Sequence, residues 1–265
     1  MAYDINGPWN PETGPNAPFN FQQGKGTPLS FVSAIDAWTG AGWPAKQLVA
    51  GLGFYGRSTV AQQDMTGDEQ NQYQAQSHEV PPGDAEDAPW YDACARMTST
   101  SGTWQWRNLR RQGVLTSTNT AAAPWVRQWD SLTQTPWLFN PSTRMFLSYD
   151  DPDSIRIKSN YAASRGLGGV MVWSINMDHN GELVDAARSF GTTGDGISTN
   201  HTAVASTTSS TRGYQATPRP SSATTPATST SAGPVSASIA ASEQGLATES
   251  SDHAPRPSSD GIVPG

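Results

Sequence analysis

Two short, almost uninterrupted apolar runs limit the folds open to this chain of 265 residues. The first covers residues 48–52 (LVAGL) and the second covers residues 170–173 (VMVW). Runs of this length without polar alternation are typical of strands covered on both faces, as in a parallel sheet. Parallel strands need long crossover connections, which are usually helical. We therefore expect an α/β fold.

Helical patterns precede both runs. Before the first, Thr27 can cap a helix whose first position is Pro28 and which ends at Gly40. Its apolar face would consist of three residues, Phe31, Ile35 and Trp38.

Before the second run, Asp151 and Pro152 open another helix, which stops at Gly166. Its apolar side chains include Ile157 and Tyr161. A last helix is expected around residues 182–188. This rhythm is that of an α/β barrel, in which catalytic groups sit at the C-terminal ends of the strands. Five side chains occupy such ends: Tyr3, Asp4, Tyr55, Arg57 and Trp173.

The rhythm breaks between Ser58 and about Arg144. Gly, Pro, Gln and Trp are mixed there with short alternating runs such as residues 103–106 (TWQW), which indicate antiparallel strands. We expect an insertion at residues 58–144, between two segments of the α/β part at residues 1–57 and 145–190.

Composition changes sharply after Phe190. Residues 191–265 are rich in Ser, Thr, Ala and Pro, with few large apolar side chains to offset the entropy of ordering. We expect a disordered tail. It is either an O-glycosylated stalk, with residues 200–202 (NHT) as an N-glycosylation acceptor, or an unmodified linker or faulty gene end.

Charge and composition indicate which classes of binding partner the chain can have. The net charge is −7 and the basic residues are scattered, which argues against nucleic-acid or anionic-membrane binding and favours a neutral polymer. Ten Trp and seven Tyr suit stacking on sugars as well as filling a core. The lone Cys94 cannot form an internal disulfide, and no Cys or His grouping has zinc-site spacing. We expect no metal and no cofactor.

The sequence shows neither an apolar run long enough to cross a bilayer nor the basic and apolar regions of a secretory signal. We expect a monomer without a membrane span.

Three motifs in order carry a resemblance to a known family. Residues 1–4 (MAYD) match an M-x-Y-D signature, residues 52–57 (LGFYGR) a second motif, and residues 168–178 (GGVMVWSINMD) a third, with SYDD at 148–151 before the last. Over about residues 1–190 the chain resembles chitinases of glycoside hydrolase family 18, and fungal members in particular.

The resemblance implies the C-terminal part of a TIM (β/α)8 barrel. It also implies that the insertion is an α+β chitinase insertion subdomain forming one wall of the substrate cleft. Four aromatic residues resemble the closing part of that subdomain: Trp125, Trp129, Trp137 and Tyr149. The implied partners are chitin or chito-oligosaccharides, and the parent family is extracellular.

The family's D-x-x-D-x-D-x-E run, which carries the catalytic acid, is absent from this sequence. Family members hydrolyse β-1,4 links between N-acetylglucosamine units with retention, and the substrate's own N-acetyl group acts as nucleophile, an exception to the two-carboxylate scheme. Since a general acid contributes roughly 10²–10⁴ in rate, we expect the chain to be nearly inactive by itself.

The resemblance also assigns roles around the cleaved bond. Tyr3 would donate its hydroxyl to the acetamido oxygen, Asp4 would hydrogen-bond the sugar and tune the acid, and Met1 would pack beneath them. Each has a structural alternative. A strand-end Tyr and Asp are usually a turn or a cap, and Met1 can be a core residue that, as a terminus, carries a charged amine.

Farther out, Trp173 would floor the subsite and Arg57 and Tyr55 would line the adjoining wall, where a guanidinium can reach sugar hydroxyls with several donors. Trp9 and Trp137 would stack at outer subsites. For Arg57 a surface ion pair is the alternative.

Other carboxylates are assigned to structure. Asp150 and Asp151 look like an acid–base pair, but Pro152 makes a helix cap the simpler interpretation. Glu182 is expected to be a first-turn residue favoured by the helix dipole. None replaces the missing acid, and neither do the four scattered histidines.

Three hypotheses follow. The chain is the substrate-holding part of a chitinase, a lectin-like remnant that binds chitin without cleaving it, or an incomplete gene model. In the last case a part-barrel would expose strand edges and apolar surface that favour aggregation.

Overall fold

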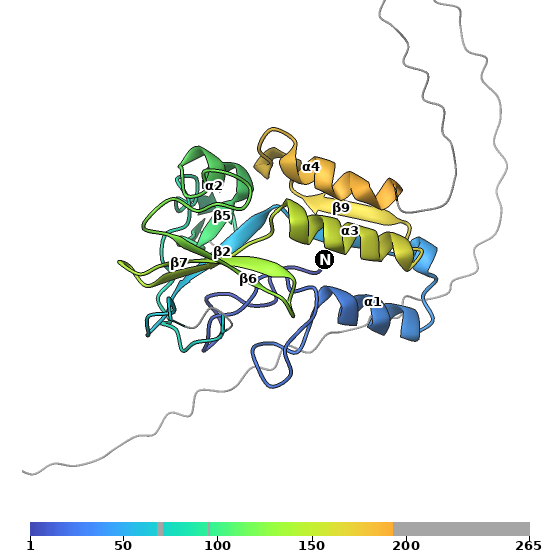
Figure 1. The fold of residues 1–265 in the computed structure, drawn as a ribbon, viewed down its shortest axis with the longest axis horizontal. Helices are drawn as coiled ribbons and strands as arrows, with labels where there is room; N and C mark the ends of the chain where they lie inside the picture. Colours follow the sequence, from blue (N-terminus) through green and yellow to red (C-terminus); the bar gives the residue numbers. More distant parts are fainter. Residues whose placement is uncertain (68–70, 95, 193–265) are drawn as a thin grey trace, which may run out of the picture. The chain divides into compact units, whose positions relative to one another are not determined.

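Residues 1–67, 71–94 and 96–192 are described by the computed structural model (Figure 1). The expected tail therefore lies, beyond Thr192, outside the described residues.

The two apolar runs form a parallel pair of strands. Strands β1 (Val49–Gly53) and β9 (Gly169–Trp173) run side by side, with Val49 opposite Gly169 and Gly53 opposite Trp173. The expected strands are confirmed, but the expectation that both are fully covered is wrong for β9, whose residues are all at least partly exposed, and for Val49 of β1, which is exposed. This sheet has two strands in the described part of the chain, so β9 has a neighbour on one side only.

The chain passes from β1 through Phe54 into an antiparallel sheet of strand order β5-β2-β8-β7-β6. Its strands are β2 (Tyr55–Val60), β5 (Thr103–Gln105), β6 (Val126–Asp130), β7 (Thr135–Asn140) and β8 (Met145–Ser148). A separate hairpin consists of β3 (Tyr91–Asp92) and β4 (Arg96–Met97). The antiparallel strand expected at 103–106 is confirmed for residues 103–105, and the boundary expected after Arg57 falls inside β2.

Helix α1 (Phe31–Gly40) ends where the sequence predicts but begins later. Its cap is Ser30, which exchanges hydrogen bonds with Ser33 in a capping box, so the prediction of Thr27 as cap is wrong. Phe31 and Ile35 are buried as expected, whereas Trp38 is exposed and contacts Trp43 edge-on.

Helix α3 (Pro152–Ser164) confirms the prediction in detail. Asp151 caps it, accepting from the backbone N–H groups of Asp153 and Ser154, and Gly166 follows its end at φ +68°. The predicted last helix is α4 (Glu182–Ala187). The remaining helical segments are α2 (Trp106–Arg111), η1 (Ala45–Gln47), η2 (Ile175–Met177) and η3 (Arg188–Gly191). Helices α3 and α4 lie together beside β9 (Figure 1).

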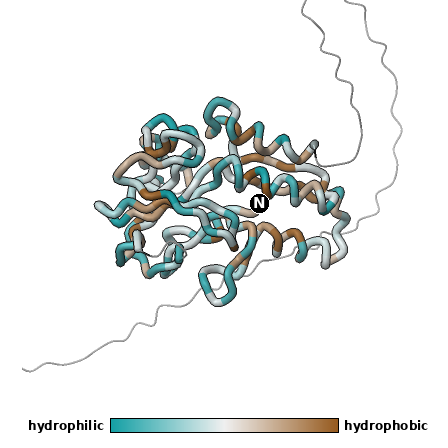
Figure 2. The backbone as a smooth tube through the Cα atoms, viewed as in Figure 1, coloured by the Kyte–Doolittle hydropathy of each residue, from teal (hydrophilic) through white to brown (hydrophobic). Residues whose placement is uncertain are grey.

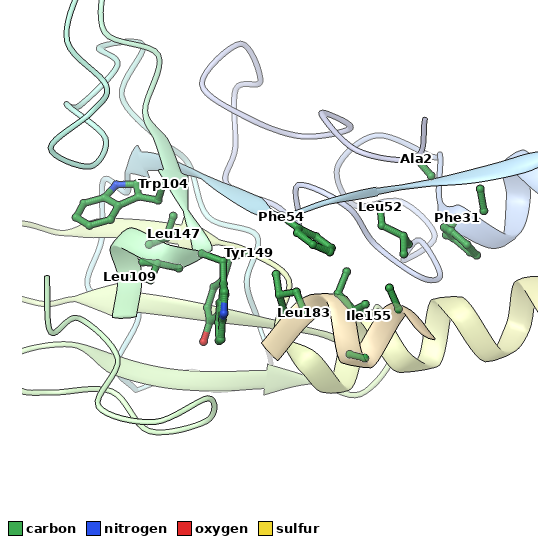
Figure 3. Packing of buried hydrophobic residues seen from close by; sticks show 14 of the residues in the cluster. Ala2, Phe31, Leu52, Phe54, Trp104, Leu109, Leu147, Tyr149, Ile155 and Leu183 are labelled. Atoms are coloured by element: carbon green, nitrogen blue, oxygen red, sulfur yellow. The ribbon is translucent and has the colours of Figure 1, made fainter. Parts of the chain in front are cut away.

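One apolar core joins the parallel pair to the antiparallel sheet. Leu52 and Phe54 point toward Ile155 of α3 and Leu183 of α4, and the cluster continues to Leu147 of β8 (Figure 3). Figure 2 shows apolar segments along β9 and within the antiparallel sheet, with hydrophilic loops around them. Because the two sheets share this core, β1 and β2 present their side chains at fixed relative positions.

A buried ion pair anchors the N-terminal segment. Lys158 of α3 is 1% exposed, and its Nζ donates to Asp150 Oδ1 at 2.5 Å and to the carbonyl of Ala17 at 2.5 Å. The pair therefore links the end of β8, α3 and the loop before α1. No helix within the described residues has the length and apolar character needed to span a membrane.

Candidate functional site

The first four residues lie directly against β1. A Cβ atom added to Gly51 would approach the Cα of Met1 to 2.9 Å, and one added to Gly53 would lie 3.4 Å from the Cβ of Tyr3. The two glycines allow this close approach because they have no side chain. The prediction that Tyr3 and Asp4 end a strand is wrong, since residues 1–4 have no strand assignment. They nevertheless reach the C-terminal side of β1.

Asp4 has a left-handed backbone, with φ +57°. Asn16, which is buried, supports it: the backbone N–H of Asp4 donates to Asn16 Oδ1 at 3.1 Å, and the side chain of Asn16 donates to the carbonyl of Tyr55 at 3.4 Å. Asp is one of the residues that tolerate this conformation. Asn16 therefore connects the N-terminal segment to β2.

Strand β2 supplies two further side chains to the same place. Tyr55 and Arg57 are two residues apart, so they lie on one face of the strand. Thr103 of the neighbouring β5 lies opposite Arg57 in the ladder. All three therefore face the segment that carries Tyr3 and Asp4.

Arg57 connects these groups. Its Nε donates to Asp4 Oδ1 at 2.9 Å and its Nη1 donates to Thr103 Oγ1 at 2.8 Å. The guanidinium carbon also lies 5.3 Å from the ring centre of Tyr55 and 5.6 Å from that of Trp9. Arg57 does form an ion pair, the alternative weighed from the sequence, but its partner is another member of the site.

These side chains enclose a cavity of about 380 Å³. Its lining consists of Met1, Tyr3, Asp4, Tyr55, Arg57, Thr103, Trp173 and Met177. Six of the eight site residues proposed from the sequence thus come together. Trp173, at the end of β9, is 55% exposed and offers an open indole face at the rim.

Burial and charge change the acidities in this cavity. Burial raises the pKa of Tyr55, and the nearby Asp4 carboxylate raises it further. The same two causes, in the same order, raise the pKa of Tyr3. Burial lowers the pKa of Arg57, but the hydrogen bond and charge of Asp4, together with Tyr55, outweigh it and raise the pKa overall. Both phenols therefore remain hydrogen-bond donors well into the alkaline range.

The two outer tryptophans have different positions. Trp9 is exposed and, with Arg57, lines an adjoining hollow of about 300 Å³, where a ligand could stack. The prediction for Trp137 is wrong: it is 1% exposed and packs against Phe146 inside a second apolar cluster. Its position in β7, whose six residues are all buried, leaves no ring face free for a sugar.

Sequence reasoning missed Thr103, Met177 and Asn16. Thr103 lies in a run predicted to be a strand, yet only the register with β2 shows that it faces Arg57. Met177 lies within the third motif, at residues 168–178, and could have been included on that ground. No local signal identifies Asn16, whose contacts with Asp4 and Tyr55 span 12 and 39 positions of sequence.

The remaining acidic residues have structural partners. Asp151 caps α3 and accepts from Arg127 at 2.6 Å, while Asp150 holds Lys158. Burial raises the pKa of Asp151, although Ser154 and Arg127 oppose the shift. The carboxylate of Glu182 accepts a hydrogen bond from the indole N–H of Trp106 at 2.9 Å. Glu182 therefore links α4 to α2 in addition to lying in the first turn of α4. In the described part of the chain, no three His, Cys, Asp or Glu side chains are grouped as a metal site requires.

Comparison with known proteins identifies the family. The sequence profile of glycosyl hydrolases family 18 matches residues 1–178. The chain belongs to this family. Its relatives include a chitinase-like effector of Moniliophthora roreri, 32% identical over 205 residues, which cover 71% of this chain and 48% of that protein. Chitinase A1 of Niallia circulans is 30% identical over 192 residues, or 69% of this chain and 24% of that enzyme.

Solved structures agree with the family. A chitinase from Rhizomucor miehei is 35% identical with a TM-score of 0.66, and the match covers 72% of this chain and 52% of that one. The Group IV chitinase of Ostrinia furnacalis is 25% identical with a TM-score of 0.55, covering 72% and 48% of the two chains. The α/β fold is thereby confirmed. The chain spans about half the length of the first of these relatives.

Proposed function

We propose that this chain binds chitin or chito-oligosaccharides by gripping one N-acetylglucosamine unit in the cavity around Tyr3, Asp4 and Trp173. The observation that carries the proposal is the meeting of these side chains with Tyr55 and Arg57 around one hollow of about 380 Å³. The hollow combines hydroxyl, carboxylate and guanidinium groups with an open indole, which are the groups that a polar ring with apolar faces requires. The Ostrinia furnacalis relative was solved in complex with allosamidin, which supports ligand binding in this fold.

Each residue has a role that follows from its position. The hydroxyl of Tyr3 is shielded from water and has no hydrogen-bond partner in the described structure, so an acetamido oxygen would satisfy it. Asp4 is fixed by Arg57 and Asn16 and offers a carboxylate acceptor. Trp173 provides an indole face on which the sugar ring can rest.

The parent activity we propose is hydrolysis of β-1,4 links in chitin by the substrate-assisted, retaining mechanism. In that mechanism the acetamido group attacks the sugar carbon and positive charge develops on the resulting ring. Asp4 would stabilise this charge, and Tyr3 would orient the acetamido oxygen. The step also needs an acid for the leaving oxygen, and this sequence has no D-x-x-D-x-D-x-E run. We therefore propose that the chain alone binds and does not turn over.

We further propose the organisation inferred from the sequence. Residues 1–57 and 145–190 would be part of a TIM barrel, and residues 58–144 an insertion subdomain that walls the cleft. The support is the likeness to the Rhizomucor miehei chitinase and the antiparallel sheet between β1 and β9. We also propose an extracellular parent protein, as the family resemblance implies. We expect the chain to be monomeric.

A binding titration beside a turnover assay tests this function. The full chain should bind chitotetraose and release no reducing ends. Tyr3→Phe should weaken binding by about three- to tenfold because one neutral hydrogen bond is lost. Wild-type turnover would overturn the proposal that the chain is inactive. Unchanged affinity in both Tyr3→Phe and Trp173→Ala would remove the site from the proposal.

A lectin-like function without any catalytic parent is the second candidate. Two relatives favour it because they are named chitinase-like effectors and not chitinases. They come from Moniliophthora roreri and Moniliophthora perniciosa, and both are 32% identical to this chain. Both candidates predict binding by this chain. They differ when an acid-bearing family 18 segment is added in trans: restored turnover supports a chitinase, and its absence alongside intact binding supports the lectin.

A further inference from the structure

A second hollow, of about 210 Å³, adjoins the cavity described above. Thr103 lines both hollows, so the two lie next to each other. The second hollow is lined by Thr103 and Gln105 of β5 and by Trp90 and Ser99, and the proposed function uses none of Trp90, Ser99 and Gln105. Trp90 immediately precedes the β3–β4 hairpin.

The wall of this second hollow is held by hydrogen bonds within the protein. The carboxylate of Asp87 accepts from the backbone N–H of Gly83 at 2.8 Å, of Ser101 at 3.0 Å and of Gly102 at 2.9 Å. It also accepts from the Ser101 hydroxyl at 2.6 Å. Asp84, which is buried, accepts from the backbone N–H of Gln105 at 2.7 Å. Both carboxylates therefore fix the backbone of the wall through hydrogen bonds. Because the wall is already ordered, less conformational entropy is lost when a ligand binds.

Trp90 is 59% exposed although its backbone is fixed. Its N–H donates to the hydroxyl of Thr98 at 2.9 Å, and the N–H of Thr98 donates to the carbonyl of Trp90 at 2.9 Å. The chain thus presents a large indole to solvent from a hydrogen-bonded position. Exposed aromatic side chains in a hollow with polar groups are typical of binding sites.

The chemistry of the hollow fits a neutral, hydroxyl-rich ligand. An indole face lies near the Ser99 hydroxyl, the Gln105 amide and the Glu86 carboxylate, which can donate to or accept from sugar hydroxyls. The carboxylates disfavour an anion. A cation is also disfavoured, because Glu86 already pairs with Arg107 and Asp87 is satisfied by the wall.

We infer that the Trp90 hollow is an additional subsite of the same groove and binds a neutral sugar unit of an oligosaccharide that extends past Thr103. This inference rests on the proposed function, because it needs the first sugar to occupy the Tyr3 cavity. It assigns to Trp90 a role in selecting long oligosaccharides over short ones.

The test compares two neighbouring aromatic residues. The full chain and its Trp90→Ala and Tyr91→Ala variants are titrated with chitobiose and with chitohexaose. Tyr91 is the matched control, since it is the next residue and is 70% exposed but does not line the hollow. Trp90→Ala should weaken hexamer binding by about tenfold, the loss expected for one stacking aromatic, and leave dimer binding unchanged. Tyr91→Ala should change neither affinity.

The outcomes separate this inference from the function beneath it. Unchanged hexamer affinity in Trp90→Ala, with clear weakening in Trp173→Ala, overturns the subsite and leaves the proposed function standing. Equal losses for dimer and hexamer also overturn it, since they indicate damage to the fold or the main cavity. A wild-type chain that binds neither oligosaccharide overturns both.

Discussion

Arg57 is held by charge, by hydrogen bonds and by two aromatic rings. Its contacts with Asp4 and Trp9 come from the N-terminal segment, and its contact with Thr103 comes from β5. A side chain fixed in this way loses little entropy when a ligand binds, and a planar guanidinium presents its remaining donors in a known geometry. Replacing it with Lys would keep the charge but lose the geometry.

The acidities of Tyr3 and Tyr55 lead to a pH prediction. Burial and the charge of Asp4 raise both pKa values above the ordinary value of 10.0. An ordinary phenol would be mostly ionised by about pH 10.5 and would then lose its donor. We expect chitotetraose affinity to stay constant from about pH 8 to about pH 10.5, as measured by titration calorimetry.

The stability of the fold has to be followed in the same experiment. In the unfolded chain these tyrosines ionise near pH 10, whereas in the folded chain they resist ionisation. Their contribution to stability is therefore complete below that pH and declines above it. Circular dichroism at each pH distinguishes unfolding from loss of the donor. The raised pKa values would be contradicted if the affinity of the folded chain fell around pH 10 and if Tyr3→Phe abolished this fall.

At the scale of secondary-structure elements, the packing of the N-terminal segment against β1 determines how closely the site residues approach one another. The N-terminal segment reaches the cavity because β1 has glycine where the segment crosses it. In Gly51→Ala the new Cβ would come within 2.9 Å of the backbone of Met1, and the segment would have to move. Because small displacements of binding groups are expensive, we expect chitotetraose affinity to fall roughly tenfold in a titration.

Gly169→Ala is the matched control for that variant. Gly169 lies on the partner strand, and a Cβ added there meets no atom within 4 Å. It should bind chitotetraose as the wild type does. Equal affinities in the two variants would mean that the contact between the N-terminal segment and β1 does not position Tyr3 and Asp4.

The buried ion pair of α3 should dominate local stability. Lys158→Met leaves the carboxylate of Asp150 buried without its cation, which typically costs about 3–5 kcal/mol. Urea unfolding followed by circular dichroism measures this loss. Arg156→Ala, which removes an exposed ion pair with Asp153 in the same helix, should change stability by less than about 0.5 kcal/mol. Similar losses in both variants would show that the Lys158 pair does not anchor the loop at Ala17.

Elements were also the scale at which the sequence was most informative. Both parallel strands, the capped start of α3 and its glycine end followed from local pattern, because these signals lie within a few residues of one another. The sequence predicts the wrong cap for α1 because Thr27-Pro28 and Ser30 both satisfy the local rule, and only the capping box with Ser33 decides between them. The prediction for Trp137 is wrong because an aromatic residue that stacks on sugar and one that fills a core have the same sequence signature.

At the scale of the whole molecule, the motifs predicted which residues meet but not how. The ends of parallel strands share one edge of a sheet, so Trp173 and the residues after β1 were expected together. The register of β2 with β5, the position of Asn16 and the hollow beside Trp90 depend on contacts between distant segments, which no local pattern encodes.

The parallel pair also leaves apolar surface on both of its sides. A hollow of about 260 Å³ lies between α1 and β1, and another of about 440 Å³ lies beside β9 and α4. Exposed apolar surface of this kind favours association. Binding experiments therefore need to be repeated at several protein concentrations, so that self-association is separated from ligand affinity.

The central claim is that Tyr3, Asp4, Arg57 and Trp173 hold one acetylated amino sugar between them. A crystal structure of the full chain with chitotetraose tests it most directly. The claim predicts a sugar ring resting on the indole of Trp173, with its acetamido oxygen within hydrogen-bonding distance of the Tyr3 hydroxyl. A tetramer bound elsewhere on the protein, or in this cavity with its acetamido group facing away from Tyr3, would contradict it.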